Sequence, residues 1–364
     1  MSPMSIAVIG AGTMGGGIAI SAAEAGVKTY LFDMSSDMLS RAETRAARYF
    51  DRLAEKGKLT VDEARAARAR ILPVRDLDAI AGAQIVIEAI HENLAAKQAL
   101  LERLSGLLGP DTIVATNTSA LRVGDLAGSL TRPARFLGMH YFSPAEINPL
   151  VELVSGPETA AASLAVAERF LQQTGKTVLR CKDASGFAVN RFFCPYANEA
   201  VRLMDEGIAE TAQIDAVARD IFDLALGPFA VMNIVKPRIM LNAVQNLGDL
   251  GPFYAAAMGL QTAGGSDAPW AIAETPAALP DPVARVVAER LMAAVWLPVL
   301  DAISEGVAIP EDFDLGARLA LRFGKPPVET MRAAGRGEVT RIVGAMAARH
   351  GQSLPEAGLE RLFA

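Results

Sequence analysis

The sequence has little of what marks secreted, membrane-bound or nucleic-acid-binding proteins. It contains only two cysteines, Cys181 and Cys194, so no disulfide framework can form and nothing points to an oxidising compartment. Basic residues are not in excess, because 35 lysines and arginines face 41 acidic residues and the net charge is −6. A nucleic-acid or membrane-surface role is therefore not expected. The chain also has no apolar run of membrane-spanning length and no basic signal segment at its start, which favours the cytoplasm.

The composition is otherwise that of a globular protein with a substantial core. Hydrophobic residues make up 51% of the chain and charged residues 21%, and 364 residues suffice for two or three domains. Since no net positive field is present, any acidic ligand has to be held by local cations or by helix ends.

The beginning of the chain has the pattern of a dinucleotide-binding unit. Residues 5–9 form a continuous apolar run, typical of a strand buried on both faces of a parallel sheet. A Gly-x-Gly-x-x-Gly turn follows at residues 10–15, and then a helical pattern over residues 16–25. Glycines at such a turn let the backbone approach a pyrophosphate closely, and the helix N-terminus faces the phosphate charge. The predicted cofactor contacts in this turn are Gly10, Ala11, Gly12, Thr13, Met14 and Gly15.

An acidic residue, Asp33, ends the next predicted strand at residues 27–32. A carboxylate at this position can bond the ribose hydroxyls of a nucleotide and would repel a 2′-phosphate. Residues 34–36 supply no arginine to hold such a phosphate, so NAD is favoured over NADP. The glycine motif alone also occurs in Gly-rich turns of unrelated chains, but here strand, turn, helix, strand and acid follow in the expected order.

Polar residues follow two further predicted strands, at residues 84–89 and 112–116. Because open α/β sheets bind ligands at the carboxyl ends of their strands, these polar residues are candidates for a site. They are Glu92, Lys97, Asn117 and Ser119. The last two could equally cap a helix over residues 123–126.

Residues 38–70 are helical in pattern and rich in charge, with a break at Gly57. Lys56 and Lys58 stand on either side of the break and are candidate contacts to a phosphate-bearing substrate. A solvated helical face explains the same pattern equally well.

One histidine, His140, stands where a catalytic group is expected. It follows the apolar run of residues 136–139, and Glu152 stands between two apolar residues, where a solvated charge would be out of place. An imidazole and a carboxylate from neighbouring strand ends form a plausible proton-transfer pair, since the carboxylate orients the ring and stabilises its cation. The alternatives are a buried structural histidine and a partly exposed carboxylate at a strand edge. We interpret the other two histidines, His91 and His350, as structural or solvated.

The alternating strand and helix pattern stops after a last predicted strand at residues 176–180. Long helical patterns take over beyond residues 183–187, and this part of the sequence matches itself at a shift of 99 positions. The matching pairs are Arg191 with Arg290, Glu206-Gly207 with Glu305-Gly306, Asp215 with Asp314, Arg219 with Arg318, and Pro228 with Pro327. Asn190 corresponds to Glu289, so a site that uses Asn190 would exist only once. Residues 259–284, rich in alanine, glycine and proline, form an ordered or a mobile connector.

We therefore predict an α/β doubly wound sheet of the Rossmann type over residues 1–185, followed by an all-α region with two tandem copies of one helical unit. The first copy and its connector cover residues 186–284, and the second covers residues 285–364. Two such copies would bury matching apolar faces against each other.

The chain resembles the NAD-dependent L-3-hydroxyacyl-CoA dehydrogenases of fatty-acid β-oxidation over most of its length. The resemblance rests on the glycine turn and on several further blocks of sequence. These blocks are Glu88-Ala89 with Glu92-Asn93-Leu94 and Lys97, Thr116 to Ser119, Gly138 to Pro144, Val151 to Val154, and Gly186 to Arg191. The part from His140 to Arg191 is much more specific than the glycine turn.

The resemblance implies oxidation of (S)-3-hydroxyacyl-CoA to 3-oxoacyl-CoA with NAD+, and it implies no metal ion. The implied catalytic residues are Ser119, His140, Glu152 and Asn190. The implied NAD contacts are the glycine turn, Asp33, Glu92, Lys97, Asn117, Ser119 and Ser143, and the implied contacts to the acyl-CoA substrate are Lys56, Ser119 and Asn190. Two positions depart from the family pattern: Ser143 stands where asparagine is common, and Tyr49 replaces a hydroxyl residue usually found before the lysine that binds coenzyme A.

In the implied reaction, His140 takes the proton of the substrate hydroxyl while the hydride passes to NAD+. Glu152 would accept the proton of the other imidazole nitrogen and so fix the tautomer. Ser119 and Asn190 would hydrogen-bond the reacting oxygen or the thioester carbonyl.

The duplicated helical unit resembles the dehydrogenase part of multifunctional β-oxidation proteins, in which two copies pack within one chain. Short members of the family carry one copy and resemble obligate dimers. We therefore expect a stand-alone enzyme with no preceding hydratase domain, either a monomer with an internal pseudo-dimer or a homodimer. Two other interpretations stay open: an NAD-dependent dehydrogenase of a free 3-hydroxy acid, of gulonate or carnitine type, and a non-catalytic NAD-binding relative.

Overall fold

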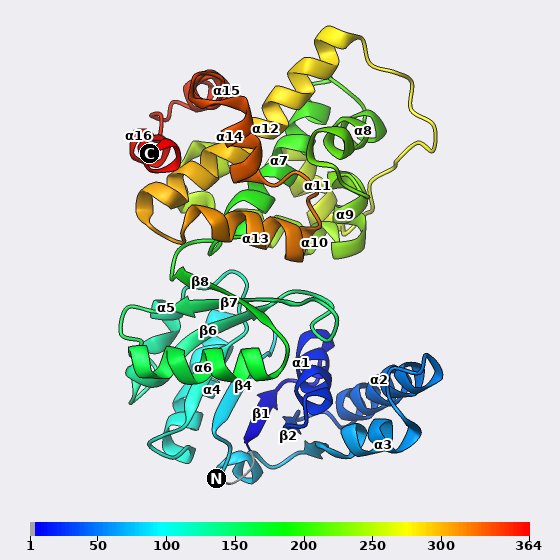
Figure 1. The fold of residues 1–364 in the computed structure, drawn as a ribbon, viewed down its shortest axis with the longest axis vertical. Coiled ribbons are helices and arrows are strands. Elements are labelled where there is room, and N and C mark those ends of the chain that lie inside the picture. The colour runs from blue at the N-terminus through cyan, green and yellow to red at the C-terminus, as the bar shows by residue number, and fades with distance from the viewer. Residues whose placement is uncertain (1–3) are drawn as a thin grey trace. The chain divides into compact units, whose positions relative to one another are not determined.

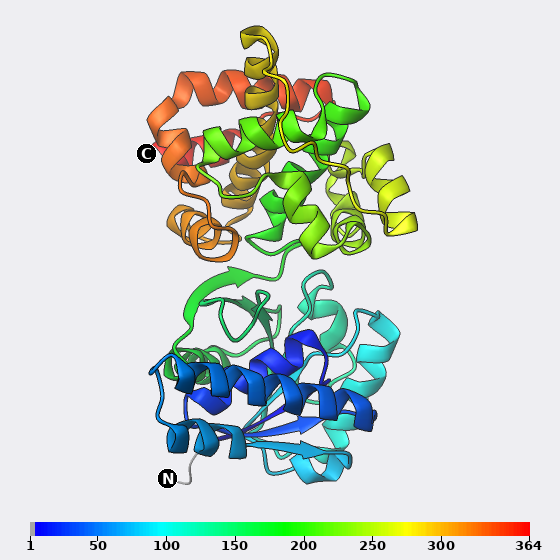
Figure 2. The ribbon, with the colours of Figure 1, turned by 90° about the vertical axis from the view of Figure 1, so that its right-hand side faces the viewer.

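The chain folds into two compact units, and the computed structural model describes residues 4–364. The first unit ends at Asp183 and the second begins at Ala184. All strands of the described chain lie in the first unit, and the second is built from helices, as Figure 1 and Figure 2 show.

An eight-stranded sheet forms the centre of the first unit, with the strand order β3-β2-β1-β4-β5-β6-β7-β8. The strands are β1 (Ser5–Ile9), β2 (Lys28–Phe32), β3 (Ile71–Val74), β4 (Ile85–Glu88), β5 (Ile113–Thr116), β6 (Phe136–Tyr141), β7 (Leu150–Ser155) and β8 (Thr177–Lys182). Strands β1 to β6 pair in parallel, while β7 is antiparallel to β6 and parallel to β8. The chain winds outward in both directions from β1, which confirms the predicted Rossmann-type sheet.

Helices on the sheet explain why its central strands are continuously apolar. Every residue of β4 and β5 is buried, as expected for strands covered on both faces. Four helices share one core with the sheet: α1 (Thr13–Glu24), α2 (Ser36–Glu55), α3 (Val61–Ala69) and α6 (Ala161–Gln173). Outside this core α4 (Leu94–Leu107) packs against α5 (Val123–Ala127), and α5 packs against β6.

The charge-rich segment at residues 38–70 forms α2 and α3, with the predicted break at Gly57. Gly57 has a φ of +67°, and Thr60 begins α3 with a capping box. The strand that follows, β3, was not indicated by the sequence. It has four residues, contains Pro73 and lies at the sheet edge, where a missing N–H donor is tolerated.

Helices α7 (Asn190–Asp205) and α12 (Asp281–Glu305) pack together at the centre of the second unit, where α12 buries Trp296. The other helices there are α8 (Thr211–Phe222), α9 (Pro228–Val235), α10 (Pro237–Gln245), α11 (Met258–Ser266), α13 (Pro310–Leu321), α14 (Pro327–Ala334), α15 (Arg336–Arg349) and α16 (Glu356–Phe363). This confirms the predicted all-α region. No helix within residues 4–364 is long and apolar enough to cross a membrane.

The connector between α11 and α12 runs beside α8 and α9 (Figure 1). The Thr211 hydroxyl of α8 donates to the Ala271 carbonyl at 2.6 Å, and Asn233 of α9 exchanges two hydrogen bonds with the Trp270 backbone. Of the two alternatives for this segment, these contacts favour an ordered connector. The predicted connector at residues 259–284 is too long, because its first part belongs to α11 and its last four residues to α12.

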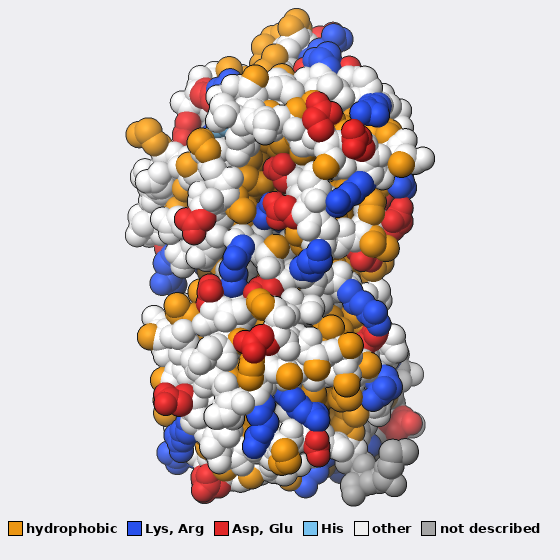
Figure 3. All heavy atoms as spheres, turned by 90° about the vertical axis from the view of Figure 1, so that its left-hand side faces the viewer, with side chains coloured by type: hydrophobic (Ala, Val, Ile, Leu, Met, Phe, Trp, Pro, Cys, Tyr) orange, Lys and Arg blue, Asp and Glu red, His pale blue; other side chains and the backbone are white. Residues whose placement is uncertain are grey.

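Acidic and basic side chains both occur across each unit on the face drawn in Figure 3. Such mixing accords with a chain whose acidic and basic residues are nearly equal in number.

Candidate active site

Strands β6 and β7 bring His140 and Glu152 into direct contact. The strands are antiparallel with His140 opposite Glu152, which places both side chains on the same face of the sheet. The imidazole Nδ1 lies 2.6 Å from a Glu152 carboxylate oxygen, and Glu152 is 0% exposed while His140 is 6% exposed. A carboxylate at this distance accepts the Nδ1 proton and leaves Nε2 to take a proton from a substrate. The alternative of a partly exposed carboxylate at a strand edge is wrong.

Neighbouring groups hold the end of β6. The Phe142 ring lies 4.5 Å from the imidazole, measured between ring centroids. Asn117, which follows β5, accepts a hydrogen bond from the Tyr141 N–H at 2.9 Å. The Asn117 amide thus joins the carboxyl ends of β5 and β6.

Helix α5 is capped by Asp183, which comes from a distant part of the chain. The Asp183 carboxylate accepts hydrogen bonds from the N–H groups of Val123 and Gly124 at 2.8 and 2.7 Å. Burial raises the pKa of Asp183, although these hydrogen bonds oppose the shift. The alternative that Asn117 or Ser119 caps this helix is therefore wrong.

The glycine turn has the close backbone contacts that a dinucleotide site needs. A Cβ on Gly10 would lie 2.6 Å from the Ala89 carbonyl oxygen, and one on Gly15 would lie 1.8 Å from the Gly10 carbonyl oxygen. Gly10 also has a φ of +104°, which favours glycine. Helix α1 begins just after Gly12 without a side-chain cap, so its first N–H groups suit a phosphate.

Asp33 lies beside this turn. Its carboxylate accepts hydrogen bonds from the N–H groups of Ala11 at 2.8 Å and Ser35 at 2.9 Å. Asp33 therefore fixes the turn as well as offering a negative charge at the end of β2, where the ribose of a dinucleotide binds in this fold.

A buried ion cluster centred on Glu88 lies at the ends of β4 and β5, and the local sequence did not indicate this role of Glu88. The carboxylate of Glu88, 0% exposed, accepts hydrogen bonds from the Lys97 ammonium at 2.6 Å and the Thr116 hydroxyl at 2.7 Å. Lys97 is 1% exposed and also pairs with Glu92 at 3.2 Å. The ammonium of Lys97 thus orients the two carboxylates, and only Glu92 retains substantial exposure.

Glu92 connects this ion cluster to Ser119. A Glu92 carboxylate oxygen accepts hydrogen bonds from the Thr118 hydroxyl and, at 3.2 Å, from the Ser119 N–H. The predicted residues Glu92, Lys97 and Ser119 are therefore joined in one hydrogen-bonded network.

Ser143 lies in the loop between β6 and β7, and Lys176 holds this loop through two hydrogen bonds. The buried Lys176 ammonium donates to the carbonyls of Ala145 at 2.7 Å and Asn148 at 2.9 Å. Burial lowers the pKa of Lys176. Lys176 was not among the predicted site residues, because the sequence pattern places it at the start of the predicted strand at residues 176–180.

Asn190 belongs to the helical unit, where it is the first residue of α7. The turn before it has positive φ at Gly186 and Phe187, +76° and +48°, and a Cβ on Gly186 would lie 2.9 Å from the Arg191 nitrogen. This turn fixes the start of α7 and hence the position of Asn190 within its unit.

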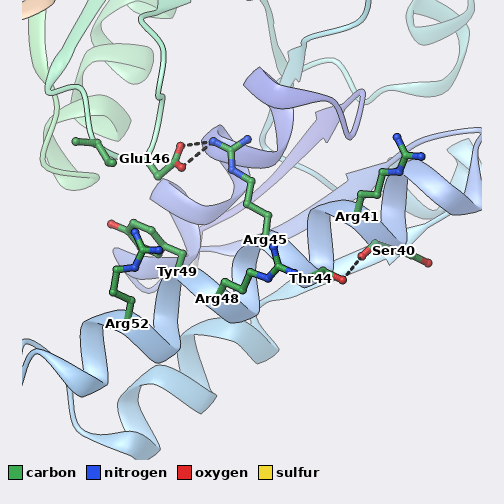
Figure 4. A pocket seen from close by; sticks show the side chains of 9 residues that line it. Ser40, Arg41, Thr44, Arg45, Arg48, Tyr49, Arg52 and Glu146 are labelled. Atoms are coloured by element: carbon green, nitrogen blue, oxygen red, sulfur yellow. Dashed lines mark hydrogen bonds and ion pairs between the residues drawn. The ribbon is translucent and has the colours of Figure 1, made fainter.

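A cationic pocket of about 590 Å³ lies along α2, and Figure 4 shows its side chains. It is lined by Ser40, Arg41, Thr44, Arg45, Arg48, Tyr49, Arg52, Glu146 and Ile147. Within residues 4–364, neither Arg48 nor Arg52 forms an ion pair. Lys56 is exposed at the C-terminal end of the same helix, and the Tyr49 hydroxyl donates to Glu24 at 2.8 Å.

In the part of the chain that the structure describes, the two remaining histidines form none of the side-chain contacts given above for the site residues. His91 is exposed after β4, and His350 lies in the helical unit with its ring 5.3 Å from that of Phe253. Burial lowers the pKa of His350 to about 4. Both placements agree with structural or solvated roles.

Comparison with known families matches both units of the chain. Residues 5–184 match the model of the 3-hydroxyacyl-CoA dehydrogenase NAD binding domain, and residues 186–262 match the C-terminal domain of the same family. The match over the first unit establishes NAD as the cofactor, as predicted.

Individual relatives agree with this assignment. The chain is 38% identical to the 3-hydroxyadipyl-CoA dehydrogenase of Escherichia coli K12 over 64% of its own length and 49% of that protein. It is 36% identical to a probable 3-hydroxybutyryl-CoA dehydrogenase of Deinococcus radiodurans, of which it covers 83%. It thus spans about half of the first relative and most of the second.

A solved structure extends the likeness to nearly the full chain. The 3-hydroxybutyryl-CoA dehydrogenase of E. coli K12 is 25% identical, with a TM-score of 0.88 over 97% of this chain and 96% of that one. Together with the family models and the site geometry, this shows that the chain belongs to the 3-hydroxyacyl-CoA dehydrogenase family.

Proposed function

We propose that this chain oxidises the 3-hydroxyl group of an (S)-3-hydroxyacyl-CoA to a ketone in acyl-CoA catabolism. The main support for this proposal is the buried contact of 2.6 Å between His140 and Glu152. These residues lie in the same sheet as β1, which the glycine turn follows. The relatives named for 3-hydroxyadipyl-CoA and 3-hydroxybutyryl-CoA support a coenzyme A thioester as the substrate.

His140 is the proposed general base. Its Nε2 accepts the hydroxyl proton, and Glu152 stabilises the imidazolium through Nδ1. Bound NAD+ supplies the acceptor for the hydride that leaves the same carbon. Ser119 and Asn190 are proposed to hydrogen-bond the reacting oxygen or the thioester carbonyl and thereby orient the carbon.

The cofactor is proposed to bind along the carboxyl ends of the parallel strands. The close approach at Gly10 and Gly15 leaves no room for a Cβ and suits a pyrophosphate, and Asp33 suits the ribose. The other proposed contacts are Glu92, Lys97, Asn117, Ser119 and Ser143. Since the Lys97 ammonium is paired with Glu88 and Glu92, its proposed contribution is to orient Glu92.

The phosphate-bearing end of coenzyme A is proposed to bind at the cationic face of α2. Lys56, Arg48 and Arg52 are exposed on this helix. Cations with no carboxylate partner are suited to phosphate oxygens, because binding breaks no existing ion pair. The Tyr49 ring lines the same pocket, at the position where the family pattern has a smaller hydroxyl residue.

We further infer that the helical unit holds two copies of one motif, at residues 186–284 and 285–364, after a cofactor domain at residues 1–185. Helices α8 and α9 have counterparts in α13 and α14 at the same shift of 99 positions. Asp215 caps the start of α9 through the N–H groups of Phe229 and Ala230, and Asp314 caps α14 through the equivalent N–H groups.

Reciprocal ion pairs support the same inference. Arg191 of the first copy pairs with Glu305 of the second, while Arg290 of the second copy pairs with Glu206 of the first at 2.5 Å. Exchange of equivalent contacts is typical of two surfaces related by a two-fold axis. We therefore propose a monomer with an internal pseudo-dimer.

The proposed reaction is tested by following NADH absorbance with acetoacetyl-CoA as oxidant. Acetoacetate with NADH, and free 3-hydroxy acids with NAD+, run in parallel as substrates without coenzyme A. We expect rapid oxidation of NADH only with the thioester. Activity confined to free acids would identify a free-acid dehydrogenase, and NADH binding without turnover of either class would identify a non-catalytic relative.

A further inference from the structure

Arg45 on α2 joins two segments that the proposed reaction uses together. Its Nη1 donates to the Thr13 carbonyl oxygen at 2.6 Å, in the first turn of α1. Its Nη2 donates to both carboxylate oxygens of Glu146, at 2.7 and 2.8 Å. Figure 4 shows the Arg45 guanidinium pointing to Glu146, away from Arg41 and Arg52. One side chain thus bridges the glycine turn and the loop that follows His140.

The bridge is part of a packed junction. The Glu146 side chain is 7% exposed and that of Arg45 is 30% exposed, so this ion pair is screened less than an ordinary surface pair. A Cβ on Gly17 of α1 would lie 2.6 Å from a Glu146 oxygen and 3.1 Å from the Ala145 Cβ. Only glycine at position 17 lets the loop approach α1 closely enough for Arg45 to reach both partners.

The loop is also anchored on its opposite side. Lys176 donates to the carbonyls of Ala145 and Asn148, and Ile147 and Asn148 both donate their N–H groups to the Pro144 carbonyl. With Lys176 on one side and Arg45 on the other, the backbone of residues 144–148 has a fixed position relative to α1. Residues 140–143 lead directly into this segment.

We propose that Arg45 is a positioning residue that fixes the position of the cofactor turn relative to the catalytic histidine. This inference rests on the proposed function. The base and the hydride acceptor must meet one carbon atom of the substrate, and a misplacement of about 1 Å can lower the rate by about a hundredfold. Arg45 links the turn suited to the cofactor pyrophosphate with the loop whose first residues follow His140, so its loss disturbs both cofactor affinity and turnover.

The test uses Arg45→Met, Glu146→Gln and the double variant in the full chain, with Arg45→Lys as the conservative variant. With acetoacetyl-CoA as substrate, we expect each single change to raise the KM for NADH and to lower kcat, each by about fivefold to thirtyfold. The double variant should be no worse than Arg45→Met alone, because both substitutions remove the same interaction. Arg45→Lys should restore part of the loss, since an ammonium can satisfy one partner at a time.

Glu146→Gln separates this role from binding of an anionic substrate in the pocket of α2. Removing an acid there should not weaken phosphate binding, so a higher KM for NADH with an unchanged KM for acetoacetyl-CoA supports the positioning role. Arg68→Met is the matched control, because Arg68 is an exposed arginine on neighbouring α3 that forms no ion pair within residues 4–364. We expect wild-type kinetics from this control.

NADH affinity, measured by fluorescence titration, keeps this inference separate from the identity of the substrate. If acetoacetyl-CoA proved not to be a substrate, a weaker NADH affinity in both single variants, not additive in the double variant, would still support the coupling. Wild-type kcat, KM and NADH affinity in Glu146→Gln would overturn it. A lower Tm with unchanged kinetics would overturn it as well, by reducing the bridge to a purely structural role.

Discussion

At the scale of single residues, His140 is distinguished by the group it contacts. Within residues 4–364, no hydrogen bond joins a ring nitrogen of His91 or His350 to a buried carboxylate. Because Glu152 is fully buried and holds Nδ1, the orientation of the ring is set before a substrate arrives. A proton can then be taken without a change of tautomer.

His140→Gln should lower kcat by about 10² to 10⁴ while NADH binding stays unchanged, because the amide keeps the volume of the ring but cannot act as a base. Steady-state kinetics with acetoacetyl-CoA and a fluorescence titration of NADH measure the two effects. His91→Gln is the control, as this exposed histidine has no part in the proposed site. Unchanged turnover in His140→Gln would disprove the base assignment.

Lys97 is a second residue whose surroundings determine what its substitution does, here to the free energy of unfolding. Lys97→Met would leave the fully buried Glu88 carboxylate without its cation, and breaking a buried pair costs about 3 to 5 kcal/mol of unfolding free energy. Thermal or denaturant unfolding measures this loss. The exposed Lys58→Met should leave the stability within about 0.5 kcal/mol of wild type. Equal stability of the two variants would contradict the structural role of Lys97.

At the scale of elements, helix ends and strand register place most groups of the site. The antiparallel register of β6 and β7 places His140 in contact with Glu152, and Asp183 caps the N-terminus of α5. In the helical unit, Asp215 and Asp314 cap the N-termini of α9 and α14 in the same manner. Each of these contacts satisfies backbone N–H groups or side chains that would otherwise lack partners inside the fold.

Asp301 on α12 makes the stability of the helical unit dependent on pH. Burial raises the pKa of Asp301 to about 6, and the Tyr254 hydroxyl lies 3.3 Å from its carboxylate. The folded state favours the protonated form of Asp301. Its stabilising contribution to the free energy of unfolding is therefore fully present below the ordinary pKa of an aspartate. It is lost as the pH rises through about 6.

Asp301→Asn should therefore raise the unfolding free energy at pH 8 by about 1 to 2 kcal/mol and change it little near pH 4. Thermal unfolding of wild type and variant at both pH values measures the difference. Asp249→Asn, at an exposed position, is the control and should show no such pH dependence. A gain that is equal at both pH values would rule out titration of Asp301 as the cause.

At the scale of the whole molecule, the inferred pair of helical copies would bury the apolar surfaces of both copies against each other within one chain. Helix α7 of the first copy packs against α12, and most residues of α7 are buried. These buried apolar residues need a partner in any soluble form of the unit.

Removal of residues 285–364 should therefore convert a monomer into dimers or larger species, because it deletes most of α12 and exposes the apolar side of α7. Light scattering after size-exclusion chromatography measures the mass of the full and shortened chains at equal concentration. A shortened chain that stays monomeric with an unchanged Tm would contradict the internal pseudo-dimer. A full chain of dimeric mass would favour the homodimer.

Much of the first unit followed from local sequence. Continuous apolar runs predicted the buried parallel strands, and glycines at positions 10 and 15 predicted the cofactor turn, because backbone approach there excludes any side chain. By contrast β3 escaped prediction, since a run of four residues with Pro73 carries little strand signal and only the neighbouring β2 makes it a strand.

The amino-acid sequence by itself determined the order of the buried strands, the all-helical second unit, the cofactor turn and the residue types of the site, since these depend on local apolar pattern and on glycine geometry. Only the tertiary structure decided which distant side chains meet. Examples are the pairing of Glu88 with Lys97, the capping of α5 by Asp183, and the bridge from Arg45 to Glu146. A contact between residues far apart in the chain depends on strand register and helix packing, and neither is encoded in the spacing of any single segment.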